Sequence, residues 1–494
     1  MYEIMNALLI YPEIPATFWS FKYALKFISK KSAHPPLGLA TIASMLPEEW
    51  NKKLVDQNVR VLRSRDIQWA DIVFISAMSI QEKMVRKLIL QCKKINKTVV
   101  AGGPLFSENP DKFPNVDHLV LNEAEITLRQ FLDDLLRGKT KRRYTTQYYP
   151  DLSTSSTPAY ELLETKKYAV MSIQVSRGCP YKCEFCQIPS LFGRKVRLKS
   201  TDQILAELTK MYNYKWRGDV FFVDDNFIGN KTFLKNDLLP ALATWMKERK
   251  YPFRFITEAS VNLADDVSLM NAMMQAGFKT VFIGIETPNE ESLMECDKLQ
   301  NKNRDLLESV WKIQKYGMLV MGGFIVGFDK DTPSVFNQQI EFIKRSGIIS
   351  AMVGLLNAPK KTRLYERLKK ERRIIDDFKG NNMDINFIPK MNIEELQKGY
   401  ENIIHAIYSC QSYYKRVKEF LSRFQVRIHF PLRIKISQIY ALFRSIIVLG
   451  FIRRGRRYYW KLFFWSLFRK PSTFGMAVTY SIYGYHFRRI FNIL

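Results

Sequence analysis

The pattern of apolar and polar positions divides the chain into three regions. Over the first 140 residues, short apolar runs alternate with stretches of helical periodicity at residues 81–94 and 124–136. Runs of this kind are typical of parallel strands, because both faces of such a strand are covered. The predicted strands are residues 6–11, 53–56, 71–77, 98–104 and 118–122. This alternation predicts an α/β fold: a doubly wound, Rossmann-like parallel sheet over residues 1–140, which binds ligands at the carboxyl ends of its strands.

A second alternation follows a turn-rich segment, residues 141–165, which is predicted to be a linker. A helix is expected at residues 200–213, with Ser200 or Thr201 as its N-cap. The strands predicted in this region are residues 168–176, 219–223, 253–257, 280–285, 319–327 and 349–356. Six such units over residues 166–371 predict a partial (βα)6 barrel, whose chemistry should lie at the carboxyl ends of its strands.

The third region, residues 372–494, is predicted to be a helical extension of unusual composition. Residues 384–424 place apolar groups at helical spacing. After Glu419 the chain holds no Asp or Glu, and residues 421–494 contain 14 Lys or Arg and 18 aromatic residues. This last segment therefore carries half of the formal net charge of +28.

Three interpretations of this basic, aromatic segment are open. Apolar blocks bracketed by arginines suit a helix that lies in a membrane interface. The same blocks could form a helical lid over the barrel, with the arginines as a solvated face, and nucleic acid is the third partner for such a surface. The Leu, Ile and Val residues make the blocks more apolar than a solvated groove would be, so no nucleic acid is expected.

The expected location follows from what the sequence contains at its ends. The N-terminus begins like a strand and has no basic segment of the kind that opens a signal peptide. The sequence contains no run of 18 or more uncharged apolar residues, so a membrane-spanning helix is not expected. We therefore expect a cytoplasmic protein that is peripheral at the inner face of the membrane.

Cys179, Cys183 and Cys186 lie at spacings of four and three, directly after a predicted strand. Three thiolates on one loop can bind three irons of a cubic iron–sulfur cluster and leave the fourth iron open for chemistry. A structural zinc site would need a further Cys or His close by, and a disulfide is not expected in a chain without a secretory signal. The other cysteines are scattered along the sequence: Cys92, Cys296 and Cys410.

This motif resembles that of the radical S-adenosylmethionine (SAM) superfamily, C-x3-C-x2-C with an aromatic residue, here Phe185, before the last Cys. The resemblance implies that the three cysteines hold a 4Fe-4S cluster whose open iron chelates the amino and carboxylate groups of SAM. One electron from the cluster then splits SAM into methionine and a 5′-deoxyadenosyl radical, which abstracts hydrogen from an unreactive C–H bond.

The ends of the predicted barrel strands resemble the SAM-binding elements of that family. Residues 284–286 resemble a G-x-E element, and residues 323–327 resemble a G-x-x-x-G element beside the adenine. The same residue types also occur in ordinary turns and N-caps. In the closing segment, Lys360 and Lys361 stand where relatives often carry Gly. No separate catalytic side chain is predicted, and the expected SAM-binding residues are Asp224, Asp225, Glu258, Ser260, Gly284, Ile285, Glu286, Gly323 and Gly327.

The first region resembles the cobalamin-binding domain found ahead of many radical SAM domains. Glycines at the strand ends would let the backbone approach a large planar ligand. Cobalamin domains that supply an axial imidazole carry D-x-H-x-x-G, but residues 56–61 contain neither His nor Gly. The cobalt would then lack a histidine ligand from this motif, and a vestigial domain is the alternative. The expected cobalamin contacts are Pro36, Leu37, Gly38, Ser76, Ser79, Gly102, Gly103 and Glu123.

The order of the three regions resembles the cobalamin-dependent, class B radical SAM enzymes, and most closely the architecture of the hopanoid C-2 methylase group of lipid-modifying enzymes. The resemblance implies methylation of an unactivated carbon of a hopanoid or isoprenoid lipid, with the hard chemistry supplied by the cofactors. The alternatives are a radical SAM cyclase or C–C bond-forming enzyme on a lipid or tetrapyrrole, and a non-catalytic Fe–S protein that binds membrane or nucleic acid. The expected partners are the substrate, an electron donor such as flavodoxin or ferredoxin, and the membrane surface.

Overall fold

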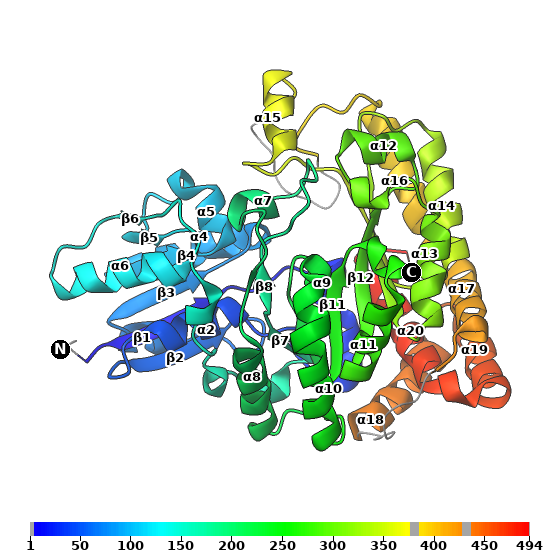
Figure 1. Cartoon of the computed structure of the whole chain (residues 1–494), viewed down its shortest axis with the longest axis horizontal. Coiled ribbons are helices and arrows are strands. Elements are labelled where there is room, and N and C mark those ends of the chain that lie inside the picture. Colours follow the sequence, from blue (N-terminus) through cyan, green and yellow to red (C-terminus); the bar gives the residue numbers. More distant parts are fainter. Residues whose placement is uncertain (1–3, 376–384, 427–435, 494) are drawn as a thin grey trace. The chain divides into compact units, whose positions relative to one another are not determined.

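The computed structural model describes residues 4–375, 385–426 and 436–493 (Figure 1). The chain forms two compact units, and each is built from segments that are far apart in the sequence. The first unit consists of Met1–Ala16, Lys31–Gly178 and Leu191–Gly218, and the second of Thr17–Lys30, Cys179–Ser190 and Asp219–Leu494. The three cysteines of the motif therefore belong to the second unit.

The first unit contains a six-stranded sheet in the order β2-β1-β3-β4-β5-β6, in which neighbouring strands are parallel. The strands are β1 (Asn6–Tyr11), β2 (Asn51–Asp56), β3 (Ile72–Ser76), β4 (Thr98–Gly102), β5 (His118–Val120) and β6 (Arg143–Tyr144). The helices include α2 (Leu37–Met45), α3 (Ser64–Trp69), α4 (Glu82–Lys93), α5 (Pro104–Glu108) and α6 (Ala124–Leu136). The predicted doubly wound sheet is confirmed, and its strand order reverses at β1, where such sheets bind ligands.

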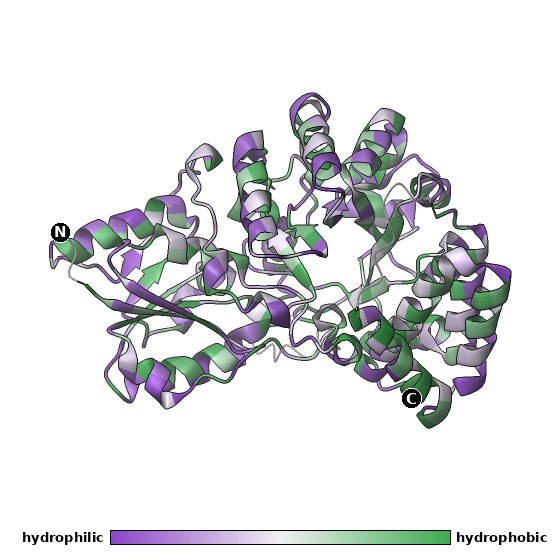
Figure 2. Cartoon of the chain, turned by 90° about the horizontal axis from the view of Figure 1, so that it is seen from below, coloured by the Kyte–Doolittle hydropathy of each residue, from purple (hydrophilic) through white to green (hydrophobic). Residues whose placement is uncertain are grey.

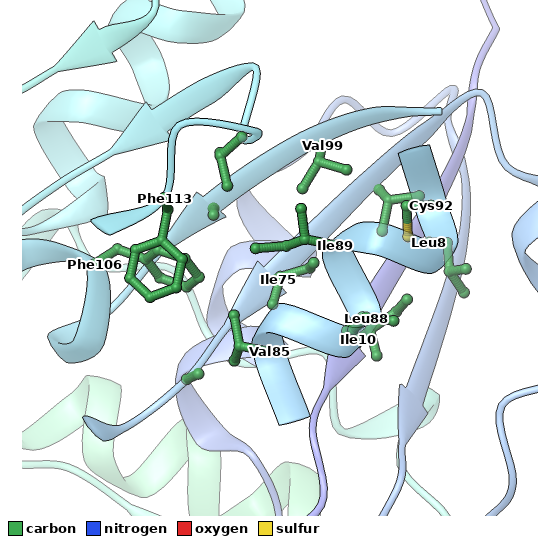
Figure 3. Close-up of a cluster of buried hydrophobic side chains, with 14 of the residues drawn as sticks. Leu8, Ile10, Ile75, Val85, Leu88, Ile89, Cys92, Val99, Phe106 and Phe113 are labelled. Atoms are coloured by element: carbon green, nitrogen blue, oxygen red, sulfur yellow. The ribbon is translucent and has the colours of Figure 1, made fainter. Parts of the chain in front are cut away.

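Apolar side chains of the strands pack on one face of α4 (Figure 3). The helix supplies this face at the spacing of an amphipathic helix, because its buried positions are 85, 88, 89 and 92. The last of these, Cys92, is fully buried, and burial raises the pKa of its thiol to about 11. Cys92 is therefore an apolar core residue, as buried cysteines commonly are. The residues of this buried apolar cluster that Figure 3 labels are Leu8, Ile10, Ile75, Val85, Leu88, Ile89, Cys92, Val99, Phe106 and Phe113.

The segment expected to be a linker is packed into the first unit. It contributes β6 to the sheet, and Tyr160 within it is buried. The Tyr160 hydroxyl lies 3.1 Å from the Ser172 carbonyl oxygen and 3.3 Å from Oε2 of Glu207. Lys199 Nζ donates to Oε1 of the same buried Glu207 at 2.5 Å. Glu207 lies on α8 (Thr201–Asn213), whose predicted cap is confirmed: the Ser200 hydroxyl accepts from the Gln203 backbone N–H.

The strand predicted over residues 168–176 is shorter in the structure. It comprises β7 (Val170–Ile173), after which the chain forms β8 (Ser176–Arg177), antiparallel to β9 (Arg197–Leu198). Arg177 Nε donates to Oε1 of Gln174 at 2.8 Å, which stabilises the bend between the two strands. Pairing with β9 ends the long strand, and a local apolar pattern could not indicate that partner.

The second unit contains five parallel strands that lie side by side in sequence order. They are β10 (Asp219–Phe222), β11 (Arg254–Ala259), β12 (Phe278–Glu286), β13 (Leu319–Val326) and β14 (Ala351–Leu355). The helices that alternate with them include α9 (Lys231–Phe233), α10 (Leu239–Glu248), α11 (Val267–Ala276), α12 (Glu290–Glu295), α13 (Leu306–Lys315), α14 (Ser334–Ser346) and α15 (Arg363–Lys370). The predicted run of βα units with a parallel sheet is confirmed.

The C-terminal region is helical, as predicted, and no helix among the described residues is long and apolar enough to cross a membrane. The helix expected over residues 384–424 is two helices that break at Ser409; Asp384 lies outside the described residues. An N-terminal segment that contains α1 (Lys22–Leu25) also packs here, with the Phe18 ring stacked on Phe487 at 4.4 Å between centroids. The elements are α16 (Ile393–Tyr408), α17 (Cys410–Arg423), α18 (Ile436–Ser445), a π-helix (Ile446–Ile452), α19 (Arg456–Arg469) and α20 (Phe474–Ile490).

The Lys199→Met variant should be less stable than the wild type by about 3–5 kcal/mol, because Glu207 would remain buried without its cation. The pKa of Glu207 is already raised by burial. The matched Lys199→Met/Glu207→Leu variant removes both charges and should recover most of the loss. Urea denaturation of the full chain, followed by circular dichroism, measures both variants. A single variant as stable as the wild type would show that this pair does not hold the first unit together.

Candidate active site

The three motif cysteines lie in an irregular segment between β8 and α7 (Ile188–Leu191). Gly178 opens this segment with φ +94°, and a Cβ there would lie 2.5 Å from the Lys195 carbonyl oxygen, so the turn requires glycine. Within the loop, the Cys186 N–H donates to the Cys183 carbonyl at 3.1 Å and closes a tight turn. All three are free thiols.

Glu184, between the second and third cysteines, fixes this loop to the rest of the second unit. Its backbone N–H donates to the Cys296 carbonyl at 2.9 Å, and its own carbonyl accepts from the Leu364 N–H at 3.0 Å. Its buried carboxylate accepts from Arg367 Nε at 2.8 Å and from Nη2 at 3.1 Å. No sequence motif pointed to Glu184, because acidic residues are common in turns.

Two of the motif thiols lose their protons less readily than a free cysteine does. Burial raises the pKa of Cys179, and raises that of Cys186 to about 12, so iron must displace their protons. No three Cys, His, Asp or Glu side chains of the described ranges converge as ligands of one ion. A cubic cluster binds each thiolate through a different iron, so three thiols on one loop fit a cluster better than a single zinc ion.

Cys296 lies far from the motif in sequence, but its backbone carbonyl accepts from the Glu184 N–H of the cysteine loop. Its thiol is fully buried, and its Sγ lies 3.7 Å from the Leu293 carbonyl oxygen one helical turn earlier. Burial raises the pKa of this thiol. Cys296 therefore packs behind the loop.

Carboxyl groups lie together at the ends of β10 and β11. Burial raises the pKa of Glu258 to about 8, and the negative charges of Asp225 and Asp224 add to that effect. Asp224 is buried, whereas Asp225 and Glu258 are half-buried. A group of carboxyls that raise one another's pKa favours a bound cation. The ammonium and sulfonium groups of SAM are cations of suitable size, so these residues fit the predicted role.

Ser260 belongs to a chain of polar side chains that reaches the cysteine loop. Asn226 Oδ1 accepts from the Ser260 N–H at 3.1 Å and lies 3.3 Å from its hydroxyl. That hydroxyl lies 2.7 Å from Asn262 Oδ1, and Asn262 Nδ2 donates to the Tyr181 hydroxyl at 3.0 Å. Sequence reasoning found Ser260 but missed the three others, which follow no spacing rule.

Glu286 and Lys298 form a buried ion pair, with 2.6 Å between Oε1 and Nζ. Burial acts to lower the pKa of Lys298, but Glu286 and the nearby thiols of Cys183 and Cys186 outweigh it and raise the pKa. Glu286 has φ +63°, a left-handed conformation that is strained for a residue with a Cβ. A Cβ on Gly284 would lie 2.3 Å from Glu286 Oε1 and 2.8 Å from Lys298 Nζ, so this glycine makes room for the pair.

Two side-chain amides bind backbone carbonyls near the carboxyl ends of β12 and β13. Asn301 Nδ2 donates to the Gly284 and Ile285 carbonyls, each at 2.9 Å, and Gln339 Nε2 donates to the Ile325 carbonyl at 2.7 Å. The Asn301 and Gln339 side-chain oxygens are buried without a hydrogen-bond partner among the described residues. Such oxygens are suited to accept from a bound ligand.

The two glycines expected beside the adenine each have a packing reason. A Cβ on Gly323 would lie 2.8 Å from the Phe282 ring, and Gly327 has φ +107°. The Gly327 N–H donates to Oδ2 of Asp331 at 2.8 Å. Their contact with adenine stays a prediction.

At the carboxyl edge of the first sheet, glycines permit close approach of neighbouring strands. A Cβ on Gly102 would lie 2.5 Å from the Val120 carbonyl oxygen, and one on Gly103 would lie 2.6 Å from Ser76 Oγ. Ser79 Oγ donates to Oε2 of Glu108 at 2.8 Å. The remaining expected contacts, Pro36, Leu37 and Gly38, lie at the start of α2.

Glu123 is held by two arginines. Its carboxylate accepts from Arg177 Nη1 at 2.7 Å and from Arg197 Nη2 at 2.7 Å. Arg177 also bonds Glu125 at 2.8 Å; burial acts to raise the pKa of Glu125, but Arg177 outweighs it and lowers the pKa to about 2. This network gives Glu123 a structural role, and its contact with cobalamin stays a prediction.

Asn58 occupies the position at which D-x-H-x-x-G carries its histidine. Its Oδ1 accepts from the Ile14 N–H at 2.8 Å, and its Nδ2 lies 2.6 Å from Asp56 Oδ1 and 3.3 Å from the Pro12 carbonyl oxygen. The amide thus binds the loop after β1 at the edge where the sheet would hold a ligand. The residues fit a corrinoid whose cobalt receives no side chain from this position.

Comparisons with known proteins agree with this geometry. The B12 binding domain matches residues 27–132, and the radical SAM superfamily matches residues 173–343. A domain of unknown function matches residues 362–494. The chain is also similar in fold to the cobalamin-dependent S-adenosylmethionine radical enzyme OxsB, solved with aqua-cobalamin and S-adenosylmethionine: the TM-score is 0.65 at 16% identity, over 99% of this chain and 80% of that one.

Two relatives are similar over most of their length. An uncharacterised methyltransferase of Synechocystis sp. is 41% identical over 98% of this chain and 91% of its own. The hopanoid C-2 methylase of Rhodopseudomonas palustris is 39% identical over 76% of this chain and 72% of its own. The chain therefore belongs to the B12-binding radical SAM family of cobalamin-dependent methyltransferases, with a 4Fe-4S cluster, SAM and cobalamin as its cofactors.

Proposed function

We propose that this methyltransferase modifies a membrane lipid of the hopanoid or isoprenoid class while docked on the membrane surface. The observation that carries the proposal is an apolar face on α18, the π-helix and α19, which exposes large side chains instead of burying them. A lipid substrate would be reached most directly by an enzyme that lies against the bilayer. The 39% identity to a hopanoid C-2 methylase supports the same substrate class.

The apolar face has the reverse of the usual amphipathic pattern. Along α18 and the π-helix, the buried positions are mostly small, namely Ala441, Ser445, Leu449 and Gly450. Phe443, Phe451 and Phe468 are 61%, 63% and 73% exposed. Contiguous exposed apolar patches mark interaction or membrane sites. The members of the face are Ile436, Ile439, Tyr440, Phe443, Ile447, Phe451, Ile452, Phe464, Leu467 and Phe468.

Cations border this face, and acidic residues are absent from that part of the sequence. In Figure 2, the helices around the C-terminus carry long hydrophobic stretches with hydrophilic residues beside them. Exposed cations next to apolar groups favour an anionic lipid surface, because each contributes about 1 kcal/mol near such a membrane. The exposed cations of this part are Arg454, Arg456, Arg457, Lys461 and Arg469.

The cofactors, when bound, would supply a radical that takes hydrogen from a substrate carbon, and the methyl group that this carbon then receives. The residues of the chain position the cofactors. Cys179, Cys183 and Cys186 would hold the cluster, and Glu184 keeps their loop in place. The carboxyls of Asp224, Asp225 and Glu258 would orient the cationic part of SAM. Lys298 of the Glu286–Lys298 pair acts electrostatically on both the motif thiols and Glu258.

Product analysis tests the proposed reaction. The anaerobically reconstituted enzyme, given SAM, reductant and liposomes that contain a hopanoid, should form both 5′-deoxyadenosine and S-adenosylhomocysteine. The lipid should gain the mass of one methylene group. A second reaction also contains a tetrapyrrole. Both nucleoside products together with a methylated tetrapyrrole and an unchanged lipid would then contradict the lipid class while leaving methyl transfer intact.

Replacing Phe443, Phe451 and Phe468 together with Ser should weaken binding to anionic liposomes by at least about tenfold, because three large apolar side chains leave the contact. Flotation of the full chain with phosphatidylglycerol liposomes measures this. The matched control replaces three exposed apolar residues of the first unit, Val61, Leu90 and Leu136, with Ser and should bind as the wild type does. Equal binding by both triple variants would rule out this face as the docking surface.

The Gly284→Ala variant should bind SAM about tenfold more weakly, because the added methyl group displaces the Glu286–Lys298 pair. Equilibrium binding to the cluster-loaded protein measures the change. Gly354→Ala in β14 is the matched control, since its Cβ meets no atom within 4 Å. Similar affinities of the two variants for SAM would show that the Glu286–Lys298 pair does not contribute to SAM binding.

A further inference from the structure

Helix α15 is bonded directly to the cysteine loop, on both sides of Cys183. The Leu364 N–H donates to the Glu184 carbonyl at 3.0 Å, and Arg363 Nη1 donates to the Lys182 carbonyl at 3.0 Å. Lys182 and Glu184 are the two peptide neighbours of Cys183. The start of α15 is therefore separated from an expected cluster ligand by one hydrogen bond and one peptide group.

On its inner side, α15 and the residues after it form ion pairs with several carboxylates of the second unit. Arg367 bonds Glu184, reaches Asp329 at 2.8 Å and reaches Glu295 at 3.2 Å. Arg373 bonds Asp329 at 2.6 Å and Glu371 at 2.7 Å. These pairs hold α15 on the loop. Asp297 also pairs with Arg363 and lies 3.7 Å from Lys182 Nζ, so it offsets part of the positive charge at the start of the helix.

The outward side of α15 and its flanks is strongly basic. Among the described residues of α15 and its flanks, the exposed acidic residues are Glu366 and Glu371, and Glu371 already bonds Arg373. Lys361, Arg363 and Lys370 line an open hollow of about 520 Å³ that also includes Glu184 in its wall. We call this surface the basic face; its exposed cations are Lys182, Lys360, Lys361, Arg363, Lys369, Lys370 and Arg372.

Lys361 carries a positive charge at a position where its backbone conformation is strained. Its backbone has φ +65°, the left-handed region that favours glycine, and a residue with a side chain there is strained. The turn keeps the conformation expected of a glycine but adds a cation beside the cysteine loop. Lys360 next to it adds another, and its carbonyl lies 3.5 Å from Gln187 Nε2 of the loop.

The basic face differs from the apolar face of α18 in what it exposes. The apolar residues Leu364 and Leu368 of α15 are buried, so no large aliphatic anchor points outward from this helix. A surface of this kind fits a transient, charge-guided protein contact, which is small and steered by complementary potentials. Such a helix has no exposed leucine that it could insert into a bilayer.

We propose that the basic face is the docking site of an acidic one-electron donor protein. The radical SAM reaction requires an electron from outside, and electron transfer slows steeply with distance, so the donor must reach the cysteine loop. In this step the reduced donor loses one electron, the cluster held by the three cysteines gains that electron, and no bond or proton is transferred. α15 brings the Arg363 guanidinium to the Lys182 carbonyl, directly beside Cys183.

The test uses the full chain with its cluster loaded, and a reduced or oxidised flavodoxin as the acidic probe. The Lys369→Glu/Lys370→Glu variant changes the charge of the basic face without touching the hydrogen bonds to the loop. Its dissociation constant at low salt should rise by at least about tenfold. The matched control, Lys83→Glu/Lys87→Glu on α4, makes the same change of charge on exposed lysines of the first unit and should stay within about twofold.

Two further readouts separate this proposal from the proposed function. Formation of 5′-deoxyadenosine driven by dithionite should be equal in all three proteins, since a small reductant needs no docking surface. Flavodoxin binding that is equal in both charge variants would overturn the proposal. A defect of the α15 variant confined to anionic liposomes or to an oligonucleotide would overturn it as well and would assign the basic face to that partner instead.

Discussion

Every polar group of Glu184 is bonded, and the geometry of the cysteine loop depends on that one residue. An irregular loop gains no hydrogen-bond ladder of its own, and fixing each of its residues costs about 1–2 kcal/mol of conformational free energy. Hydrogen bonds from Glu184 to other segments offset this cost; its partners are the Cys296 carbonyl, the Leu364 N–H and the Arg367 guanidinium. Because these partners lie on two separate segments, the turn after α12 and helix α15, the cysteine loop and both segments must be ordered together.

The fold was predictable where local pattern and final environment agree. The limits of β1 and of α6 match the apolar pattern to the residue, because both elements bury the faces that their own sequence marks. The pattern failed where a distant partner decides the structure. The strand before the cysteines is shortened by pairing with β9, and residues 17–30 join α20 through rings such as Phe18 and Phe487. Neither partner has a signature near the segment it changes.

The site was predictable to a similar and limited degree. Cysteine spacing indicated the loop that is the candidate cluster site, and polar residues at strand ends indicated the carboxyls, since parallel strands bring those ends to one edge. Lys298 and Asn301 could not be found, because a lysine or asparagine after a short helix is usually solvated. Their importance comes from Gly284, whose missing side chain leaves the space that the Glu286–Lys298 pair occupies. A glycine chosen for a neighbour's side chain looks, in sequence, like any other glycine.

Two surfaces of the second unit show how one composition can serve different interactions. α18 turns Ala441 and Ser445 inward and large apolar residues such as Phe443 outward, whereas α15 turns leucines inward and lysines outward. Apolar burial acts only on contact and strengthens little or not at all when salt is removed, while attraction between exposed charges acts over a Debye length of about 10 Å at 0.1 M salt. Ionic strength therefore distinguishes the two surfaces: added salt should abolish most of the binding by the basic face, whereas the apolar face should lose only the share that its bordering cations contribute. The net charge of +28 alone could not make that distinction, because it depends on which side of each helix the arginines and lysines occupy.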